Sequence, residues 1–399
     1  LGLLQAVAMR RFPPAVSVVL CVLLAGFAVA PRLLAQDQSL LEDPLFEAYA
    51  KRGLAELYDM RYDEAAATFG FLAGRHPEHP VVPFLEGLVP WWRILADLGS
   101  TEHDNAFLAA MDRTIDRADR MLRRDDDNLD ALFFKGAALG FRGRHHANRK
   151  NYLRAARDGQ RALRYVLRVN EQSPDNPDFL FGIGIYDYFA VAVPERHAVA
   201  RPFAAMFPPG DKGRGLSNLH RTYRHGSYIQ TEAAYFLLQI YYLYERDYVK
   251  TLQFMEYLRE QHPNNAFFHA LEGRVLARFG HWDQAADVWT DALSKVRRSQ
   301  TGYNDSVAEQ AHYYLAQRAM RLRNYDRALT HFADLRRVAE QRDGTSAFVV
   351  LGRLREGMAH DANGDRPSAE AAYRDVLRLR EVGTSRDRAR RYLERPYRG

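Results

Sequence analysis

Six residues in the second half of the chain have side chains that could grip a carboxylate or an acidic peptide. Three are arginines, whose planar guanidinium group offers two parallel hydrogen bonds to a carboxylate. The other reading is a solvated helix face, on which arginine stems cover apolar neighbours. The six residues are Tyr244, Arg274, Arg278, Tyr313, Gln317 and Arg321.

The stretch from Phe179 to Val193 is a second candidate, because it is apolar or aromatic on nearly every face of a helix. A helix of this kind is buried or faces a membrane, and this one is too short to span a bilayer. We therefore expect it to be shielded from water. It is either buried core or an inserted element that binds an apolar ligand or a partner helix. Its aromatic residues are Phe179, Phe181, Tyr186, Tyr188 and Phe189.

The segment "GDKGRG" at 210–215 is rich in glycine but lacks the Gly-Lys-Ser/Thr ending of a phosphate loop. We interpret it as a turn in which Asp211 caps a helix over 215–223. No Gly-x-Ser-x-Gly elbow is present for a serine nucleophile. We expect no catalytic residue and no cofactor.

Two pairs of histidines invite a metal interpretation: His76 with His79, and His145 with His146. Neither pair has a third ligand at helical spacing, and no His-Glu-x-x-His motif occurs. We expect both pairs to lie in surface turns, and we expect no metal site.

The elements that must position these residues are helical hairpins, because one spacing recurs four times. A small residue is followed twelve residues later by alanine, and an aromatic residue follows four residues after that. This is the skeleton of a helix–turn–helix repeat of about 34 residues. The small residue allows the second helix to approach closely, and the aromatic fills the gap to the next hairpin. The four sets are Gly53, Ala65 and Phe69; Gly273, Ala285 and Trp289; Ala316, Ala328 and Phe332; Gly357, Ala369 and Tyr373.

This pattern resembles the tetratricopeptide repeat family over most of residues 45–382. The resemblance implies an all-α, right-handed superhelix of about eight hairpins. From the sequence itself we expect a short basic helix near 386–393 and an irregular central element at 177–226, where prolines break the hairpin pattern. In the repeat frame, the residue after the small position faces the concave groove, as do those one turn away, which selects the six residues above. The stretch "DFLFGIGIYDYFAVAVPERH" at 178–197, followed by "PPGDKGRGLSNL" at 208–219, also resembles a second group. That group comprises exported bacterial repeat proteins and a eukaryotic set linked to organelle membranes and lipid droplets.

Residues 1–35 have the pattern of a short upstream segment followed by a signal peptide. Met9 is the expected start, Arg10 and Arg11 follow, and an apolar run leads to the expected cleavage after Ala35. Cleavage after Ala30 and an uncleaved anchor are the alternatives. We expect export to the periplasm or to the periplasmic face of the outer membrane, with the solenoid formed by residues 36–399.

The cysteine content and the net charge argue against some classes of site and partner. The single cysteine, Cys21, lies in the leader, so the mature chain has no disulfide and no thiolate metal site. The leader holds three arginines and no acid, so the net charge of +6 falls to +3 for residues 36–399. Such a mild charge, interleaved with acids, does not favour nucleic acid.

An array of stacked hairpins is a binding surface first, so we predict a non-enzymatic scaffold that holds a protein or peptide in its groove. An acidic partner segment would suit the arginines. The alternative is a carrier of a hydrophobic ligand or lipid, built around residues 179–193. A cavity lined by those aromatic residues would favour the carrier. The partner's identity, contact with a membrane surface and the oligomeric state are left open.

Overall fold

The computed structural model describes residues 39–198, 201–204, 207–342 and 346–399, in which every regular element is helical. The expected leader, residues 1–35, lies outside the described residues. Before the main unit, residues 40–42 form the 3-10 turn η1 (Leu40–Glu42). Residues 44–399 form one compact unit. Among the described residues, no helix is both long enough and apolar enough to cross a bilayer.

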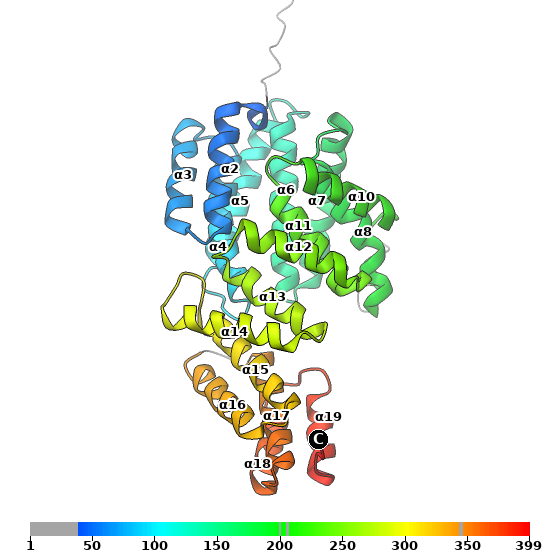
Figure 1. Ribbon diagram of the computed structural model, residues 1–399. Helices are drawn as coiled ribbons and strands as arrows, with labels where there is room; N and C mark the ends of the chain where they lie inside the picture. The colour runs from blue at the N-terminus through cyan, green and yellow to red at the C-terminus, as the bar shows by residue number, and fades with distance from the viewer. Residues whose placement is uncertain (1–38, 199–200, 205–206, 343–345) are drawn as a thin grey trace, which may run out of the picture. The chain divides into compact units, whose positions relative to one another are not determined.

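Consecutive helices of residues 44–399 pair as hairpins, and each hairpin packs on the next along the chain (Figure 1). The described residues contain eight such pairs, as the repeat spacing predicts. A short basic helix, α19 (Ser385–Glu394), packs on the last pair. The pairs are α2 (Pro44–Tyr58) with α3 (Tyr62–Arg75), α4 (Val81–Ala96) with α5 (Asp104–Leu122), α6 (Leu129–Asn148) with α7 (Tyr152–Gln172), α8 (Leu180–Arg196) with α10 (Lys212–His225), α11 (Gln230–Gln239) with α12 (Tyr248–Gln261), α13 (Ala266–Arg278) with α14 (Trp282–Arg297), α15 (Asp305–Arg321) with α16 (Tyr325–Ala339), and α17 (Ala347–Ala362) with α18 (Arg366–Arg378).

Local sequence explains where these helices begin and end. Short polar side chains cap the N-termini: Asn265 accepts the backbone N–H of Phe268 at 3.0 Å, and Asn324 accepts that of Arg327 at 3.1 Å. Several of the turns inside hairpins contain a residue of positive φ, such as Gly280 at 92° and Gly364 at 84°. Glycine adopts this conformation without the steric penalty of a Cβ, so the chain reverses within a few residues.

The repeated small residue and aromatic residue pack against each other inside one hairpin. A Cβ added to Gly273 would lie 2.5 Å from the Trp289 ring, and Gly53 and Gly357 lie equally close to Phe69 and Tyr373. The ring also reaches the next hairpin, since Trp289 stacks on Tyr314 with ring centroids 5.2 Å apart. The aromatic position therefore joins two hairpins, and the all-helical solenoid expected from the spacing is confirmed.

Replacing Gly273 with leucine should lower the free energy of unfolding by about 1–3 kcal/mol, because overpacking of a filled core has that cost. Trp289 is fully buried and stacked, so it cannot swing away. Gly70→Leu in α3 is the matched control, since a Cβ there meets nothing within 4 Å. Urea denaturation of both variants tests this. Equal midpoints for the two would show that Gly273 is not a close-approach position.

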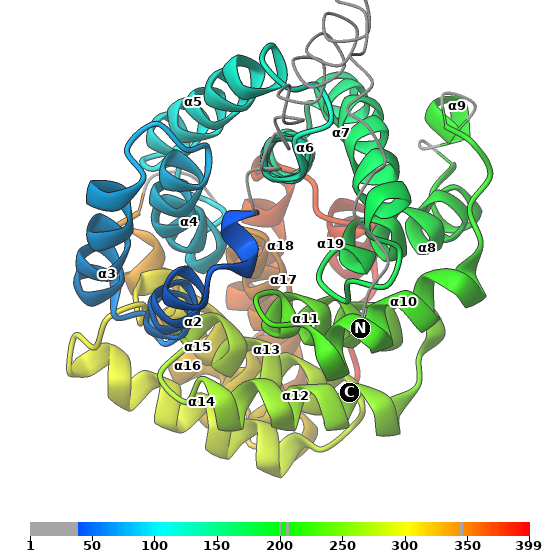
Figure 2. The same ribbon diagram turned by 90° about the horizontal axis from the view of Figure 1, so that it is seen from above.

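The central segment, residues 177–226, holds helices α8 and α10, which are separated by a longer stretch of chain than the two helices of any other hairpin. Helices α8 and α10 pair as a hairpin, and the short helix α9 (Arg201–Ala204) lies between them in the chain (Figure 2). Asp211 caps α10 as predicted, accepting the backbone N–H of Arg214 at 2.9 Å, but the helix starts at Lys212 rather than at 215. A Cβ on Gly215 would lie 2.6 Å from the backbone nitrogen of Tyr188. Glycine in this segment thus serves close helix packing.

The first hairpin also contacts helices far along the chain, which a nearest-neighbour array would not require. The Tyr58 hydroxyl at the end of α2 donates to Glu232 of α11, and the Asn265 side chain donates to the Tyr58 carbonyl at 2.6 Å. The second hairpin makes a similar contact: Asp97, just after α4, pairs with Arg342, just after α16, at 2.7 Å. The repeat spacing does not predict these contacts.

Candidate functional site

Two of the predicted arginines share one aromatic neighbour. Arg274 is half-buried in α13, and Arg278 is exposed one turn later. The Arg278 guanidinium lies 5.1 Å from the centre of the Tyr242 ring. Tyr242 belongs to η3 (Ile240–Glu245), the π-helical continuation of α11. Burial raises the pKa of Tyr242, and both arginines oppose that shift, so both act on the same hydroxyl.

Tyr313 is 5% exposed, so it belongs to the core rather than to an open groove. The next hairpin covers it, because its ring contacts Phe348 with centroids 5.4 Å apart. Its hydroxyl accepts a hydrogen bond of 3.2 Å from Arg355 of α17. Arg355 was not among the predicted residues, because it lies two residues before the small residue Gly357, at a position that the repeat frame did not select. Arg274 and Arg355 both oppose the rise in the pKa of Tyr314 that burial causes.

The remaining predicted residues do not join this group. Gln317 is half-buried in α15. Arg321 is exposed, and its guanidinium lies 4.5 Å from the centre of the Trp282 ring at the start of α14. The structure therefore brings Arg274 and Arg278 together, whereas Arg321 covers a different ring.

The arginines of this region divide into two kinds. Arg274, Arg278 and Arg355 form no ion pair with any described residue, and the Nε atom of Arg274 is buried without a hydrogen-bond acceptor there. Some arginines on the same or neighbouring helices are instead neutralised. Arg318 pairs with Asp283 at 2.6 Å. Arg353 likewise pairs with Asp375 at 2.6 Å. The unpaired guanidinium groups are free to bind an anion.

The aromatic stretch 179–193 forms most of α8 and is only partly shielded. Phe179 and Tyr188 are buried, at 4% and 0% exposed. Phe181 and Phe189 are half-buried and meet Phe236 of α11, with ring centroids 5.5 and 6.1 Å apart. Tyr186 is also half-buried, and its hydroxyl donates to the Pro208 carbonyl. The stretch therefore has one core face and one face that carries accessible rings.

The two predicted sites are in contact with each other. Tyr244 of η3 packs on Phe189, with ring centroids 5.5 Å apart. Phe236 in turn lies under the Arg144 guanidinium at 5.0 Å. We call this set the arginine–aromatic surface, and it comprises Arg144, Phe181, Phe189, Phe236, Tyr242, Tyr244, Arg274, Arg278, Tyr314 and Arg355.

The histidine pairs differ in part from expectation. His145 and His146 lie in the last turns of α6, and His145 is 3% exposed, so the expected surface turn is wrong there. His145 lies 3.2 Å from an oxygen of Asp104. His79, before α4, contacts Asp130 at 3.2 Å.

A third histidine pair was missed by the sequence analysis. His312 of α15 faces His331 and Asp334 of α16, and the ligand atoms of the three residues lie within 4.8 Å of one another. Burial lowers the pKa of His331, and it lowers that of His312 to about 4. The detectable signal was the pair His331 and Asp334, three residues apart on one helix face.

A polar cleft of about 510 Å³ lies where the first hairpin's turn meets the segments around 264 and 300. Asp59, Arg61, Glu64 and Arg93 contribute to its lining, and Arg61 pairs with Asp59 at 3.8 Å. Acids and arginines are mixed in this lining, which also includes Asp63, so the cleft has no cluster of like charge that would select an anion. None of the predicted site residues lines it.

Comparisons with known proteins add little to this geometry. No family model matches the chain, and no curated protein matches it. Among solved structures, the crystal structure of yeast Tom70 aligns with 87% of this chain and 94% of its own, at 10% sequence identity and a TM-score of 0.30. At that score the alignment carries no argument, so the tetratricopeptide-like fold rests on the hairpins and their packing.

Proposed function

We propose that this chain is a non-enzymatic repeat scaffold that binds an acidic segment of a partner protein on its arginine–aromatic surface. The unpaired state of Arg274, Arg278 and Arg355 carries the proposal. A guanidinium group beside an aromatic ring combines charge with apolar contact. An extended segment with carboxylates and apolar side chains would satisfy both. We propose also that the chain acts after export, for which the leader-like pattern of residues 1–35 is the support.

A carrier of lipid or of another hydrophobic ligand is the less favoured proposal. The half-buried rings of Phe181 and Phe189 are in contact with Phe236 and Tyr244. Rings that already pack on one another leave a ligand only their outer faces. Arg144, which lies over Phe236, places a cation beside these rings. That arrangement suits an amphipathic segment better than an aliphatic chain.

The double variant Arg278→Ala, Arg355→Ala should bind an acidic peptide at least tenfold more weakly than the unchanged chain. Each lost hydrogen bond to a charged group costs about 1.5–3 kcal/mol, and 1.4 kcal/mol is a factor of ten. Fluorescence anisotropy with a labelled peptide of glutamate and phenylalanine measures this. Added salt should weaken the binding, because it screens exposed charges.

The control for this experiment removes two arginines that are already paired. Arg318→Ala, Arg378→Ala makes the same change in net charge, and these residues pair with Asp283 and Asp375. Its affinity for the peptide should equal that of the unchanged chain. If both double variants lost the same affinity for the peptide, the effect would be explained by net charge alone, and the proposed surface would be wrong. If a peptide of lysine and phenylalanine bound as tightly as the glutamate–phenylalanine peptide, the proposal of an acidic partner would be wrong.

A further inference from the structure

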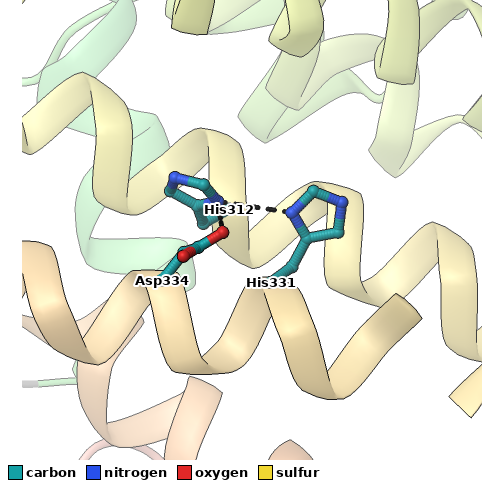
Figure 3. Close-up of side chains that lie close together, drawn as sticks. All are labelled: His312, His331 and Asp334. Carbon is teal, nitrogen blue, oxygen red and sulfur yellow. Dashed lines mark hydrogen bonds and ion pairs between the residues drawn. The ribbon is translucent and has the colours of Figure 1, made fainter. Parts of the chain in front are cut away.

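The α15–α16 hairpin brings together three side chains that metal ions favour, none of which belongs to the arginine–aromatic surface. His312 projects from α15, and His331 and Asp334 project toward it from successive turns of α16 (Figure 3). The Nδ1 atoms of the two histidines are 3.3 Å apart, and Nδ1 of His312 lies 3.8 Å from an oxygen of Asp334. We propose that His312, His331 and Asp334 bind one divalent transition-metal ion, with zinc the best-suited choice.

The spacing of the three ligand atoms supports the proposal. Zinc bonds to nitrogen and carboxylate oxygen are about 2.0–2.2 Å long, so two ligands of a tetrahedral ion lie on the order of 3.4 Å apart. The two imidazole nitrogens already have this separation. All three ligand atoms lie within 4.8 Å of one another. Rotation of one side chain, with a movement on the order of 1 Å, completes the set.

The carboxylate is held by a neighbour that leaves one oxygen for the ion. Arg337 donates to Oδ1 of Asp334 at 2.8 Å, whereas Oδ2 is the oxygen that faces His312. A hydrogen bond of this kind to a ligating carboxylate is common around metal sites, because it fixes the orientation of the ligand. Asp334 and His312 are partly buried, with side chains 27% and 15% exposed. A water molecule can therefore reach the fourth position.

The ligand set also indicates the class of metal. Imidazole nitrogen suits zinc, copper and nickel, whereas calcium and magnesium prefer oxygen ligands alone. Three protein ligands with an open fourth position are typical of zinc sites that keep a water molecule. Positive charges nearby oppose the ion, since Arg297 and Arg337 act on His312, and Arg327 acts on His331. We therefore expect the site to bind more weakly than a four-ligand structural site.

Titration of the untagged, chelator-treated full chain with zinc by calorimetry tests the proposal. We expect one ion per chain, and we expect at least a tenfold loss of affinity in His331→Ala and in Asp334→Asn. Zinc should also raise the thermal midpoint of the unchanged chain, because an ion that binds the folded state stabilises it. Bound cobalt should give the visible absorption of a tetrahedral site in the unchanged chain, and this absorption should be lost in His331→Ala and in Asp334→Asn.

The matched control is His360→Ala, one hairpin later. His360 lies 3.4 Å from Asp365, so this pair has the same chemistry without a third ligand. Its zinc affinity should equal that of the unchanged chain. If His331→Ala fails to fold, Asp334→Asn together with His312→Gln decides the question. Zinc binding that is absent, or equally strong in all these variants, would show that the two histidines share only a hydrogen bond.

Discussion

Asp178→Ala is expected to lower the free energy of unfolding by about 3–5 kcal/mol, because it removes a charged acceptor from three backbone N–H groups at once. A hydrogen bond to a charged group contributes about 1.5–3 kcal/mol, and losses within one network are not additive. Asp178 is 6% exposed, so water would not replace the lost acceptor freely. Chemical denaturation followed by circular dichroism measures the loss.

The position of Asp178 explains why the effect should be large. It precedes α8, and its oxygens accept the backbone N–H groups of Ser227, Tyr228 and Ile229 at 2.9–3.0 Å, just before α11 begins. One carboxylate therefore ties the α8–α10 hairpin to the next one. Gly226 is required beside it, because a Cβ there would lie 2.8 Å from an Asp178 oxygen.

Two further variants make the Asp178 test specific. Asp178→Asn retains one carbonyl oxygen as acceptor, so it should lose less stability than the alanine variant. Asp175→Ala removes an acid three residues earlier whose side chain is 97% exposed, and surface substitutions of that kind change stability by about 0.5 kcal/mol or less. Midpoints that coincide for Asp178→Ala and Asp175→Ala would mean that these backbone groups do not depend on the carboxylate.

The features that the sequence predicted are those set by short-range spacing. Gly273 and Trp289 meet inside one hairpin, so their distance along the chain determines their contact. The same holds for the eight hairpins and for the cap at Asp211. Each is fixed within about one 34-residue repeat, which is the range over which the repeat pattern carries information.

The features that the sequence analysis missed depend on contacts between repeats. Tyr313 was placed in the groove by its position in the frame, but Phe348 of the next hairpin covers it. Arg355 was missed for the same reason, because it reaches the arginine–aromatic surface through a contact with Tyr313 of the preceding hairpin. His312 and His331 lie on facing helices, 19 positions apart in the chain. A search for histidines that are close in sequence therefore does not find this pair. The contact between Tyr58 and Glu232 spans 174 positions, which no repeat spacing encodes.

That long-range contact places a carboxyl group in an unusual environment. The Tyr58 hydroxyl donates to one oxygen of Glu232, and the other oxygen is buried without a hydrogen-bond partner among the described residues. Burial raises the pKa of Glu232 to about 7 from an ordinary value of 4.5, although Tyr58 and Arg144 oppose the shift. The folded chain therefore holds a proton on Glu232 over a pH range in which the unfolded chain releases it.

Glu232→Gln should remove a loss of stability that the unchanged chain shows between pH 4.5 and pH 7. Over that window the folded state binds more protons than the unfolded state, so the free energy of unfolding falls as pH rises. The stabilisation is complete below pH 4.5 and is lost as pH passes through about 7. A shift from 4.5 to about 7 corresponds to about 3 kcal/mol at most, at 1.36 kcal/mol per unit. Urea denaturation from pH 4.5 to pH 8 measures the slope.

The difference in free energy of unfolding between Glu232→Gln and the unchanged chain separates the effect of Glu232 from that of other groups that titrate. Burial lowers the pKa of nearby His262 to about 4, which gives stability a slope of the opposite sign, but His262 is present in both proteins. Glutamine is neutral at every pH and can still accept the Tyr58 hydrogen bond, so the variant should match the unchanged chain near pH 4.5. By pH 8 it should be more stable by up to about 3 kcal/mol. A difference that stays constant across the range would mean that Glu232 is charged where the first hairpin meets α11, and that this contact tolerates a carboxylate as well as a carboxylic acid.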